Sequence, residues 1–469
     1  MNFYFEAAKT LDRLDAKQGS IKGVIATLPE KDRKRTAALV IETLKYKLVL
    51  TDVIVQTNLL KDERKITSMN LALVLVHDLL LAGGIQAGDG PIKQGILRHK
   101  TRLNGEFQKI KIKRGVRSNA GLAQAGDERA VHIPRYVRVN ASVWTVEEAI
   151  ESFISKGFTL SNPFDSSKSF SKDAHIPDLL LFNPQHAFHD DPAYKAGKLI
   201  LQDKASCFPA FVLSPLANDD SIVIDATAAP GNKTSHLSAL MRNRGKLYAF
   251  ERDRKRFATL QMMLSKTSCK NVEPINADFL TIDPSDLKFG AATHILLDPS
   301  CSGSGIVNRL DHLLDTEEEN EATREGRLNK LSAFQLMMIK HAMKFPNVQK
   351  IVYSTCSIHA TENEHVVRDA LNSDEAKTGP FRLAPHNEVL PTWERRGIVE
   401  EMDSPEDAHS VVRCSPGEDA TNGFFVSCFV RCATASGAKR KAVDSDGETE
   451  RAKPSRKKRK KKAKAAAGT

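Results

Sequence analysis

From residue 221 onward, short apolar runs alternate with amphipathic segments, and this rhythm constrains the fold more than any other feature of the chain. The apolar runs read as strands: SIVIDAT, KLYAFER, VEPINAD, THILLDP, KIVYST and GFFVSCFV. The segments between them have helical spacing: KTSHLSALMRN, RKRFATLQMMLSK, LSAFQLMMIKHAMKF and ENEHVVRDALN. Val-, Ile- and Leu-rich runs that end in small or acidic residues are typical of buried, mostly parallel strands. We therefore predict an α/β, Rossmann-like doubly wound domain over 216–432, with its ligand at the carboxyl ends of the strands.

The first 129 residues have a helical rhythm instead. RTAALVIETLKYKLVLTDVIVQTNLL and SMNLALVLVHDLLLAG repeat apolar residues at i, i+3, i+4 and i+7. His77 and Asp78 interrupt the longest apolar run, so we expect a buried helix there, no membrane span and no membrane partner. We predict a helical N-terminal region over 1–129.

A small module is predicted over 130–215. The run HIPRYVRVN is strand-like, and SVWTVEEAIESFISKGF is an amphipathic helix. Thr145 and Glu148 have the spacing of a capping box at the start of that helix. We expect a small α+β fold.

Positive charge is concentrated in two segments. Of the net charge of +11, residues 439–464 supply most, with 13 basic and 4 acidic residues. The tail over 433–469 has no aromatic residue, so we expect it to be disordered and its block KPSRKKRKKKAK to direct the protein to the nucleus and nucleolus. The second segment, 93–117, has nine basic residues and one acid, and the alternation in QKIKIKRGVR suggests a strand or loop that faces RNA or DNA. A merely solvated face is the alternative.

Seven cysteines without a signal peptide indicate free thiols in a reducing compartment. Cys414, Cys428 and Cys432 lack the paired spacing of a zinc site and lie in a strand-like stretch. We expect them to pack in the core, and we predict no metal site.

The stretch IVIDATAAPGNKTSHLSAL reads as a strand, a turn of small residues and a helix. Ala228, Ala229 and Gly231 leave the backbone unobstructed, Pro230 fixes the turn and Lys233 opens the helix. The turn has a single glycine and no GxGxxG, so it suits S-adenosylmethionine better than a dinucleotide with a pyrophosphate. The alternative is a tight strand-to-helix turn without a ligand.

Acidic residues at the ends of later strands support a nucleotide-like ligand. Glu251 ends the next strand and is placed to bind ribose hydroxyls, and Arg256 lies on the first turn of the following helix. Asp278 and Asp298 end two further strands and are expected to face the same crevice.

Two cysteines follow the later strands, Cys301 in LLDPSCSGSGI and Cys356 in IVYSTCSIHATENE. Carboxyl ends of parallel strands lie on one edge of a sheet, so both thiols are expected at one pocket. Beside a methyl donor, a thiolate can attack C6 of cytosine and make C5 nucleophilic enough to be methylated. Amino methylation is disfavoured, because Ser300 and Cys301 follow the DP dipeptide where an aromatic residue would stack the base.

Three motifs in order, DATAAPGNKT, LLDPSCSGSG and YSTCSIHATENE, resemble the Sun-domain (RsmB-like) family of RNA cytosine-5 methyltransferases. The resemblance covers residues 130–432 and is strongest to the eukaryotic nucleolar subgroup. It implies an S-adenosylmethionine-dependent enzyme that forms 5-methylcytosine in large-subunit ribosomal RNA, with pre-ribosomal particles as partners and with the 130–215 module helping to hold RNA. The family's commonest turn has proline directly before the first cysteine, whereas Ser300 intervenes here.

Residue roles follow from the same resemblance. Cys356 is implied to attack C6, and Cys301 to assist breakdown of the covalent adduct. Asp298 is also implied to lie close to the cytosine. The implied cofactor contacts are Thr227, Ala228, Ala229, Pro230, Gly231, Asn232, Lys233, Glu251, Arg256, Asp278 and Asp298.

Three alternatives remain open at this point. The cysteine roles can be exchanged, so that Cys301 attacks and Cys356 assists. The substrate can be another RNA. The protein can also be a catalytically silent RNA-binding factor of ribosome assembly, although the intact cofactor turn argues against that.

Overall fold

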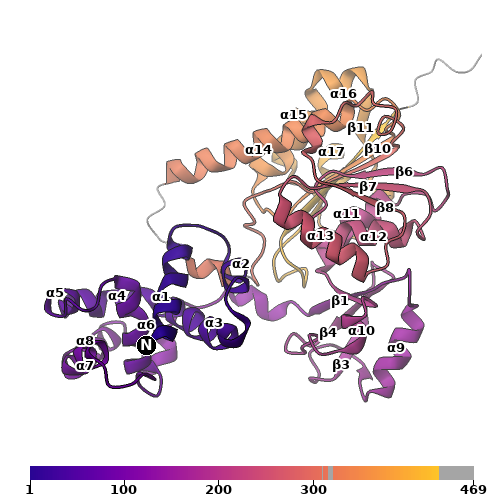
Figure 1. The fold of residues 1–469 in the computed structure, drawn as a ribbon. Helices are drawn as coiled ribbons and strands as arrows, with labels where there is room; N and C mark the ends of the chain where they lie inside the picture. The colour runs from indigo at the N-terminus through magenta and orange to yellow at the C-terminus, as the bar shows by residue number, and fades with distance from the viewer. Residues whose placement is uncertain (309, 315–320, 433–469) are drawn as a thin grey trace, which may run out of the picture. The chain divides into compact units, whose positions relative to one another are not determined.

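The N-terminal region of this computed structural model is a bundle of helices, shown in indigo to purple in Figure 1. The structure describes residues 1–308, 310–314 and 321–432. The helices are α1 (Asn2–Asp15), α2 (Ile21–Ala26), α3 (Glu30–Lys45), α4 (Lys47–Gln56), α5 (Leu59–Asp62), α6 (Met69–Leu81), α7 (Pro91–Arg98) and α8 (Lys100–Lys113). The predicted basic tail, 433–469, lies outside the described residues.

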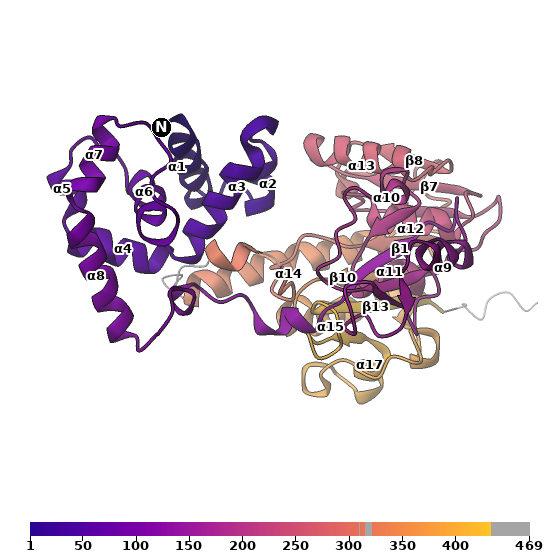
Figure 2. The ribbon, with the colours of Figure 1, turned by 90° about the horizontal axis from the view of Figure 1, so that it is seen from below.

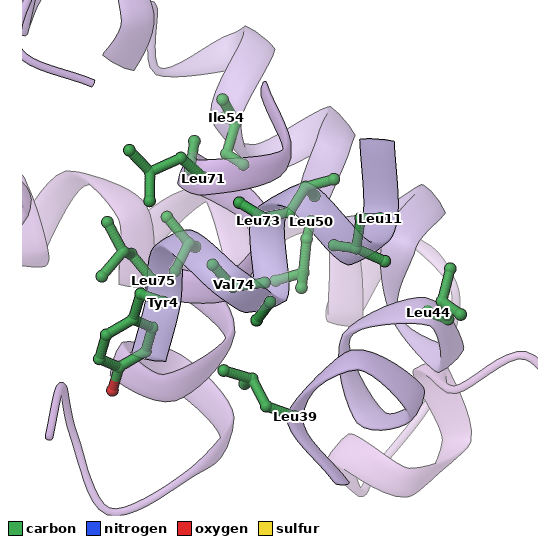
Figure 3. Close-up of a cluster of buried hydrophobic side chains, with 14 of the residues drawn as sticks. Tyr4, Leu11, Leu39, Leu44, Leu50, Ile54, Leu71, Leu73, Val74 and Leu75 are labelled. Atoms are coloured by element: carbon green, nitrogen blue, oxygen red, sulfur yellow. The ribbon is translucent and has the colours of Figure 1, made fainter. Parts of the chain in front are cut away.

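Helix α6 is the centre of the bundle. Every residue from 70 to 78 is buried, and Figure 2 shows α6 surrounded by α1, α4 and α7. Leu11, Leu50 and Leu73 point into the shared core (Figure 3). The prediction of a buried helix is confirmed, because a helix that is apolar on all sides must be covered on all sides. Within the described ranges, no helix combines the length and the apolar character needed to cross a bilayer.

The basic segment is helical, so the prediction of a strand or loop over 93–117 was wrong. Its first part forms α7 and α8. Leu103 and Phe107 are buried and Ile110 packs beside them, a spacing of four and three residues that makes one apolar stripe. The alternation in QKIKIK covers only the last turn, where Ile112 is 78% exposed. Packing of the stripe outweighs the local alternation.

The second part of the chain builds a small sheet in the order β2-β3-β4-β1-β5. Its elements are β1 (Arg135–Val139), α9 (Val146–Ser155), β2 (Thr159–Leu160), β3 (Ser169–Lys172), β4 (Leu179–Phe182), α10 (Pro192–Lys195) and β5 (Leu199–Leu201). Thr145 and Glu148 form the predicted capping box at α9. Phe153, Phe170 and Phe182 pack the core between α9 and the sheet. The predicted α+β fold is confirmed.

A larger sheet follows, in the order β11-β13-β10-β9-β6-β7-β8, with β12 paired to β13. Its elements are α11 (Lys204–Leu213), β6 (Ile222–Asp225), α12 (Asn232–Leu240), β7 (Lys246–Phe250), α13 (Arg254–Lys266), β8 (Val272–Ile275), β9 (His294–Leu297), α14 (Glu321–Met343), β10 (Lys350–Thr355), α15 (Glu364–Asn372), α16 (Asp374–Thr378), β11 (Phe381–Leu383), α17 (Pro405–Ser410), β12 (Val412–Cys414) and β13 (Phe424–Arg431). All six predicted strands are present. Strands β6 to β10 are parallel, whereas β13 runs antiparallel to β10.

Helices cover both faces of this sheet, which confirms the doubly wound fold (Figure 1). Alternate residues of a strand point to opposite faces. In β6, Val223 packs with α11 and α12, whereas Ile224 packs with α14 and α15. In β10, Val352 packs on the same face as Val223, and Ile351 packs on the same face as Ile224. The runs are apolar throughout because neither face meets water.

Seven short 3-10 turns complete the described chain: η1 (Asn119–Leu122), η2 (Glu128–His132), η3 (Phe279–Thr281), η4 (Leu310–Leu314), η5 (Ala360–Glu362), η6 (His386–Glu388) and η7 (Val399–Glu401). In the sheet, β7 and β8 follow on one side of β6, whereas β9 and β10 follow on its other side. The direction in which strands are added therefore reverses between β6 and β9. A ligand crevice is expected at the carboxyl side of such a reversal.

Candidate active site

The carboxyl ends of the parallel strands open into one cavity of about 710 Å³. Eleven of the thirteen predicted site residues line it: Thr227, Ala229, Pro230, Asn232, Lys233, Glu251, Arg256, Asp278, Asp298, Cys301 and Cys356. Residues that the sequence did not single out also line it, including Gln202, Ser206, Phe250, Phe279 and Phe424. These residues come from several elements, so no single motif reveals them.

Ala228 and Gly231 lie outside the cavity lining. Ala228 is 4% exposed and packs in the small core against α13. Gly231 has φ +111° and directly precedes α12. A Cβ there would lie 3.1 Å from the Cβ of Met263, so the position needs both the backbone freedom and the small size of glycine. Both residues shape the turn and do not face the cavity.

Glu251 and Arg256 form the wall at the end of β7. Oε1 of Glu251 accepts the N–H of Asp253 at 2.9 Å, and its Oε2 lies 3.6 Å from Nη1 of Arg256. Nη2 of Arg256 donates to the carbonyl oxygen of Ala229 at 2.7 Å. Arg256 therefore connects this carboxylate to the turn after β6. Farther along the wall, Oδ1 of Asp278 accepts the N–H of Leu280 at 3.0 Å.

Lys233 and Asp298 form an ion pair that also lines the cavity. Nζ of Lys233 lies 2.7 Å from Oδ2 of Asp298 and also donates to Oγ of Ser206 at 3.1 Å. The Oγ of Ser354 donates to the other carboxylate oxygen at 2.8 Å, and the N–H of Asp298 donates to Oγ1 of Thr227 at 2.9 Å. Burial opposes the charge of Lys233, but the attraction and hydrogen bond of Asp298 raise its pKa above the usual value. Lys233 is therefore a fixed cation.

The two cysteines lie together at the ends of β9 and β10. Their Sγ atoms are 3.1 Å apart, a hydrogen-bond distance for sulfur. The hydrogen bond to Cys356 and the burial of the site raise the pKa of the Cys301 thiol far above its usual range. At this distance either sulfur can donate a hydrogen bond to the other. The additional Ser300 does not turn Cys301 away from the cavity.

Close backbone contacts hold the two cysteine turns together. The N–H of Gly305 donates to the carbonyl oxygen of Cys356 at 2.9 Å, and the N–H of Gly423 donates to the carbonyl oxygen of Gly305 at 2.7 Å. A Cβ at Gly305 would lie only 2.3 Å from the oxygen of Gly423. Only glycine allows this approach.

Glu362 braces the turn of Cys301, and the sequence alone did not identify it. Its side chain is fully buried. The carboxylate accepts the N–H of Ser302 at 2.9 Å, the Oγ of Ser302 at 2.5 Å and the Nε2 of Gln335 at 3.0 Å. Nε2 of Gln335 also donates to the carbonyl oxygen of Ser300 at 3.0 Å. The available signal was a carboxylate placed just after the cysteine motif, in ATENE.

Asn363 and Glu364 brace the turn of Cys356 in the same way. Oδ1 of Asn363 accepts a hydrogen bond from the hydroxyl Oγ1 of Thr355 at 2.6 Å. Arg413 binds the buried carboxylate of Glu364 through two nitrogens, each at 2.6 Å, and donates to the carbonyl oxygen of Ile358 at 3.1 Å. Glu362, Asn363 and Glu364, the last three residues of ATENE, thus fix the loops on both sides of the thiol pair.

Family models match most of the chain in three segments. Residues 210–430 match the model of the 16S rRNA methyltransferase RsmB/F family. Residues 34–123 and 133–202 match the N-terminal and ferredoxin-like domains of NOL1/NOP2/Sun domain family member 5. The last match agrees with the small α+β sheet.

Relatives align over nearly the full length. The 25S rRNA (cytosine-C(5))-methyltransferase rcm1 of Schizosaccharomyces pombe is 43% identical over 91% of this chain and 91% of its own. The chain belongs to the RsmB/F Sun-domain family of methyltransferases. A second Sun-domain relative, the 28S rRNA (cytosine-C(5))-methyltransferase of Mus musculus, is 42% identical over 92% of this chain and 91% of its own. The resemblance of the three motifs is thereby confirmed.

A solved structure supports the Sun-domain fold. The methyltransferase homolog protein from Pyrococcus horikoshii covers 80% of this chain and 99% of its own, with a TM-score of 0.52 at 22% identity. At this identity the likeness concerns the fold alone.

Proposed function

We propose that this protein is an S-adenosylmethionine-dependent enzyme that forms 5-methylcytosine in large-subunit ribosomal RNA. The observation that carries the proposal is the thiol pair of Cys301 and Cys356, 3.1 Å apart, in the same cavity as the ion pair of Lys233 and Asp298. A scaffold that only binds RNA has no use for a half-buried thiol pair beside a fixed cation.

The wall at the end of β7 fits the nucleoside part of S-adenosylmethionine. Glu251 is 5% exposed and lines the cavity as a carboxylate, the group that binds vicinal ribose hydroxyls. Phe250 and Phe279 supply apolar surface for an adenine. The small side chains of Thr227 and Ala229 leave room for the ligand at the turn after β6. When bound, the cofactor supplies an electrophilic methyl group. Within the described residues, no cluster of His, Cys, Asp and Glu is arranged to bind a metal ion.

The surroundings of the thiol pair support Cys356 as the nucleophile. The raised pKa of Cys301 makes it the thiol to which we assign the proton, so that the sulfur of Cys356 is the acceptor in their hydrogen bond. The charge of Lys233 acts on Cys356 and favours its thiolate. An exchange of roles would require Cys301, the thiol with the strongly raised pKa, to ionise first.

The covalent steps then follow from these positions. The thiolate of Cys356 forms a bond to C6 of cytosine, and the electron pair of the C5–C6 double bond becomes available at C5. C5 would take the methyl group of bound S-adenosylmethionine, and the bond from that group to the sulfonium sulfur would break with the electron pair staying on that sulfur, as S-adenosylhomocysteine. The C5 proton passes to water, the double bond forms again and the C6–S bond breaks. Cys301 donates a hydrogen bond to the departing thiolate of Cys356. Asp298 and Lys233 offer an acceptor and a donor to the polar edge of the base.

Basic surfaces support an RNA partner. Helix α8 exposes Lys100, Lys109 and Lys113, and phosphate contacts of this kind supply most of the sequence-independent affinity for nucleic acids. The basic block of the tail, residues 439–464, supports action on pre-ribosomal particles in the nucleolus.

The test is a map of 5-methylcytosine in large-subunit ribosomal RNA from cells that carry Cys356→Ala. We expect one methylated cytosine of the wild type to become unmethylated. Cys432→Ala is the matched control, because Cys432 lies outside the cavity lining and should leave methylation intact. An unchanged map in Cys356→Ala would instead favour a catalytically silent assembly factor or another RNA substrate.

A further inference from the structure

Arg138 lies on β1 of the small sheet, and its whole side chain is buried. Both ribbon views show β1 beside α12, the helix that begins with Asn232 and Lys233 (Figures 1 and 2). Arg138 is the largest of the fully buried side chains of the described residues. It therefore connects β1 directly to α12, in addition to the core that Tyr136 and Leu179 of the small sheet share with Val223 of the large one.

One branch of its contacts holds the first turn of α12. Nη2 of Arg138 donates to Oγ of Ser235 at 2.8 Å and to the carbonyl oxygen of Asn232 at 3.2 Å. Ser235 itself donates to that carbonyl at 3.0 Å. These contacts fix the backbone immediately before Lys233.

A second branch reaches the ammonium group of Lys233. Nε of Arg138 donates to Oε1 of Gln202 at 2.8 Å, and Nε2 of Gln202 donates to the carbonyl oxygen of Ser206 at 3.0 Å. Oγ of the same Ser206 accepts the ammonium of Lys233 at 3.1 Å. Both the backbone at Lys233 and one of its two side-chain acceptors thus depend on one guanidinium.

Stability alone is a poor reason for this arginine. Nη1 of Arg138 and both ring nitrogens of the buried His236 have no hydrogen-bond partner among the described residues. A buried charge whose hydrogen bonds are incomplete lowers stability, and apolar replacements of similar volume are often neutral or stabilising. What an apolar side chain cannot replace is the planar fork that donates in two directions.

We infer that Arg138 is a positioning residue that holds Lys233 toward Asp298 by fixing both the first turn of α12 and Ser206. This inference rests on the proposed function, because it gives Lys233 a place beside the reacting base. It also assigns a task to the small sheet in addition to holding RNA: its strand β1 keeps the catalytic lysine in place.

The first test is a double-mutant cycle between Arg138→Met and Lys233→Met. The measured quantity is the single-turnover rate of methyl transfer from labelled S-adenosylmethionine to saturating transcribed large-subunit ribosomal RNA. We expect Arg138→Met alone to slow transfer by about tenfold or more, but by less than about twofold when Lys233 is already methionine. Arg138→Lys should not restore the rate, because it lacks the fork. Losses that multiply in the double variant would overturn the inference.

The second test needs neither cofactor nor activity. Amide hydrogen exchange over residues 230–240 should be faster in Arg138→Met than in the wild type, measured without cofactor. Arg135→Met is the control, because Arg135 lies on the same strand and its guanidinium donates to the carbonyl oxygen of Pro184; its exchange and rate should match the wild type. Unchanged exchange in Arg138→Met would overturn the inference. If the wild-type protein transfers no methyl group, that result counts against the proposed function. The exchange measurement would still test whether Arg138 holds the first turn of α12.

Discussion

Sγ of Cys301 lies 3.1 Å from Sγ of Cys356, although 55 positions separate the two residues in the sequence. The pKa of Cys301 is raised by its hydrogen bond to Cys356 and by burial, and in the proposed mechanism Cys301 holds the proton of the pair. This asymmetry gives the two thiols different chemistry within one cavity.

Cys301→Ala should accumulate a covalent protein–RNA adduct. Without the Cys301 thiol, no hydrogen bond assists the departing sulfur of Cys356, so we expect release to slow by about 100-fold. Denaturing gel electrophoresis with labelled RNA measures the adduct. Cys356→Ala and the double variant should form none, and an adduct in Cys356→Ala together with none in Cys301→Ala would reverse the assignment.

Glu251→Gln should weaken binding of S-adenosylhomocysteine by about tenfold or more, because a hydrogen bond to a charged carboxylate contributes about 1.5–3 kcal/mol. Isothermal titration calorimetry measures the dissociation constant. Glu273→Gln is the control, since Glu273 pairs with Lys246 and Lys288 outside the cavity lining. Equal affinities in the two variants would remove Glu251 from the cofactor site.

Glu362→Gln should lower both stability and activity. The amide group cannot accept all three hydrogen bonds that reach the buried carboxylate from Ser302 and Gln335. One buried group left without its partner lowers the free energy of unfolding by about 1–3 kcal/mol, and the turn of Cys301 loses its brace. Urea unfolding and the transfer rate measure the two effects. Glu400→Gln, at an exposed position, should change neither.

Asp225 should make the protein less stable as pH rises from 4 to 6. Burial raises its pKa to about 6, although Thr234 donates to the carboxylate at 2.7 Å. In this window the native state binds a proton that the unfolded state has released, so the free energy of unfolding falls as pH rises, by about 3 kcal/mol in total. Asp225→Asn has no such proton, so its stability relative to wild type should improve over the window. Parallel urea-unfolding curves against pH would contradict this origin.

Removal of Lys100, Lys109 and Lys113 should reduce the salt dependence of RNA binding. Each lost phosphate contact on single-stranded RNA lowers the slope of log K against log salt by about 0.7. We therefore expect the triple alanine variant to lose roughly two units of slope. Filter binding at several salt concentrations measures it. A triple variant of Lys22, Lys31 and Lys34, exposed lysines near α2 and α3, should keep the wild-type slope.

Features that depend on the spacing of residues close together in the chain could be predicted from the sequence. The strands of the large sheet, the buried helix α6 and the capping box of α9 all follow from local spacing. A strand or loop was predicted where helix α8 lies, because the last turn of this helix alternates apolar and basic residues as a strand does. The burial of Leu103 and Phe107 shows that the helical period determines the structure. The antiparallel direction of β13 also had no local signal.

The amino-acid sequence by itself determined the α/β class, the turn after β6 and the two cysteine motifs, because each depends on residues close together in the chain. The tertiary structure alone decided that Lys233 pairs with Asp298, that Glu362 braces the turn of Cys301 and that Ala228 faces the core. Each of these depends on a contact between distant segments or on burial by another element. Spacing along the chain carries no record of such contacts, because they form only when the sheet brings its strand ends to one edge.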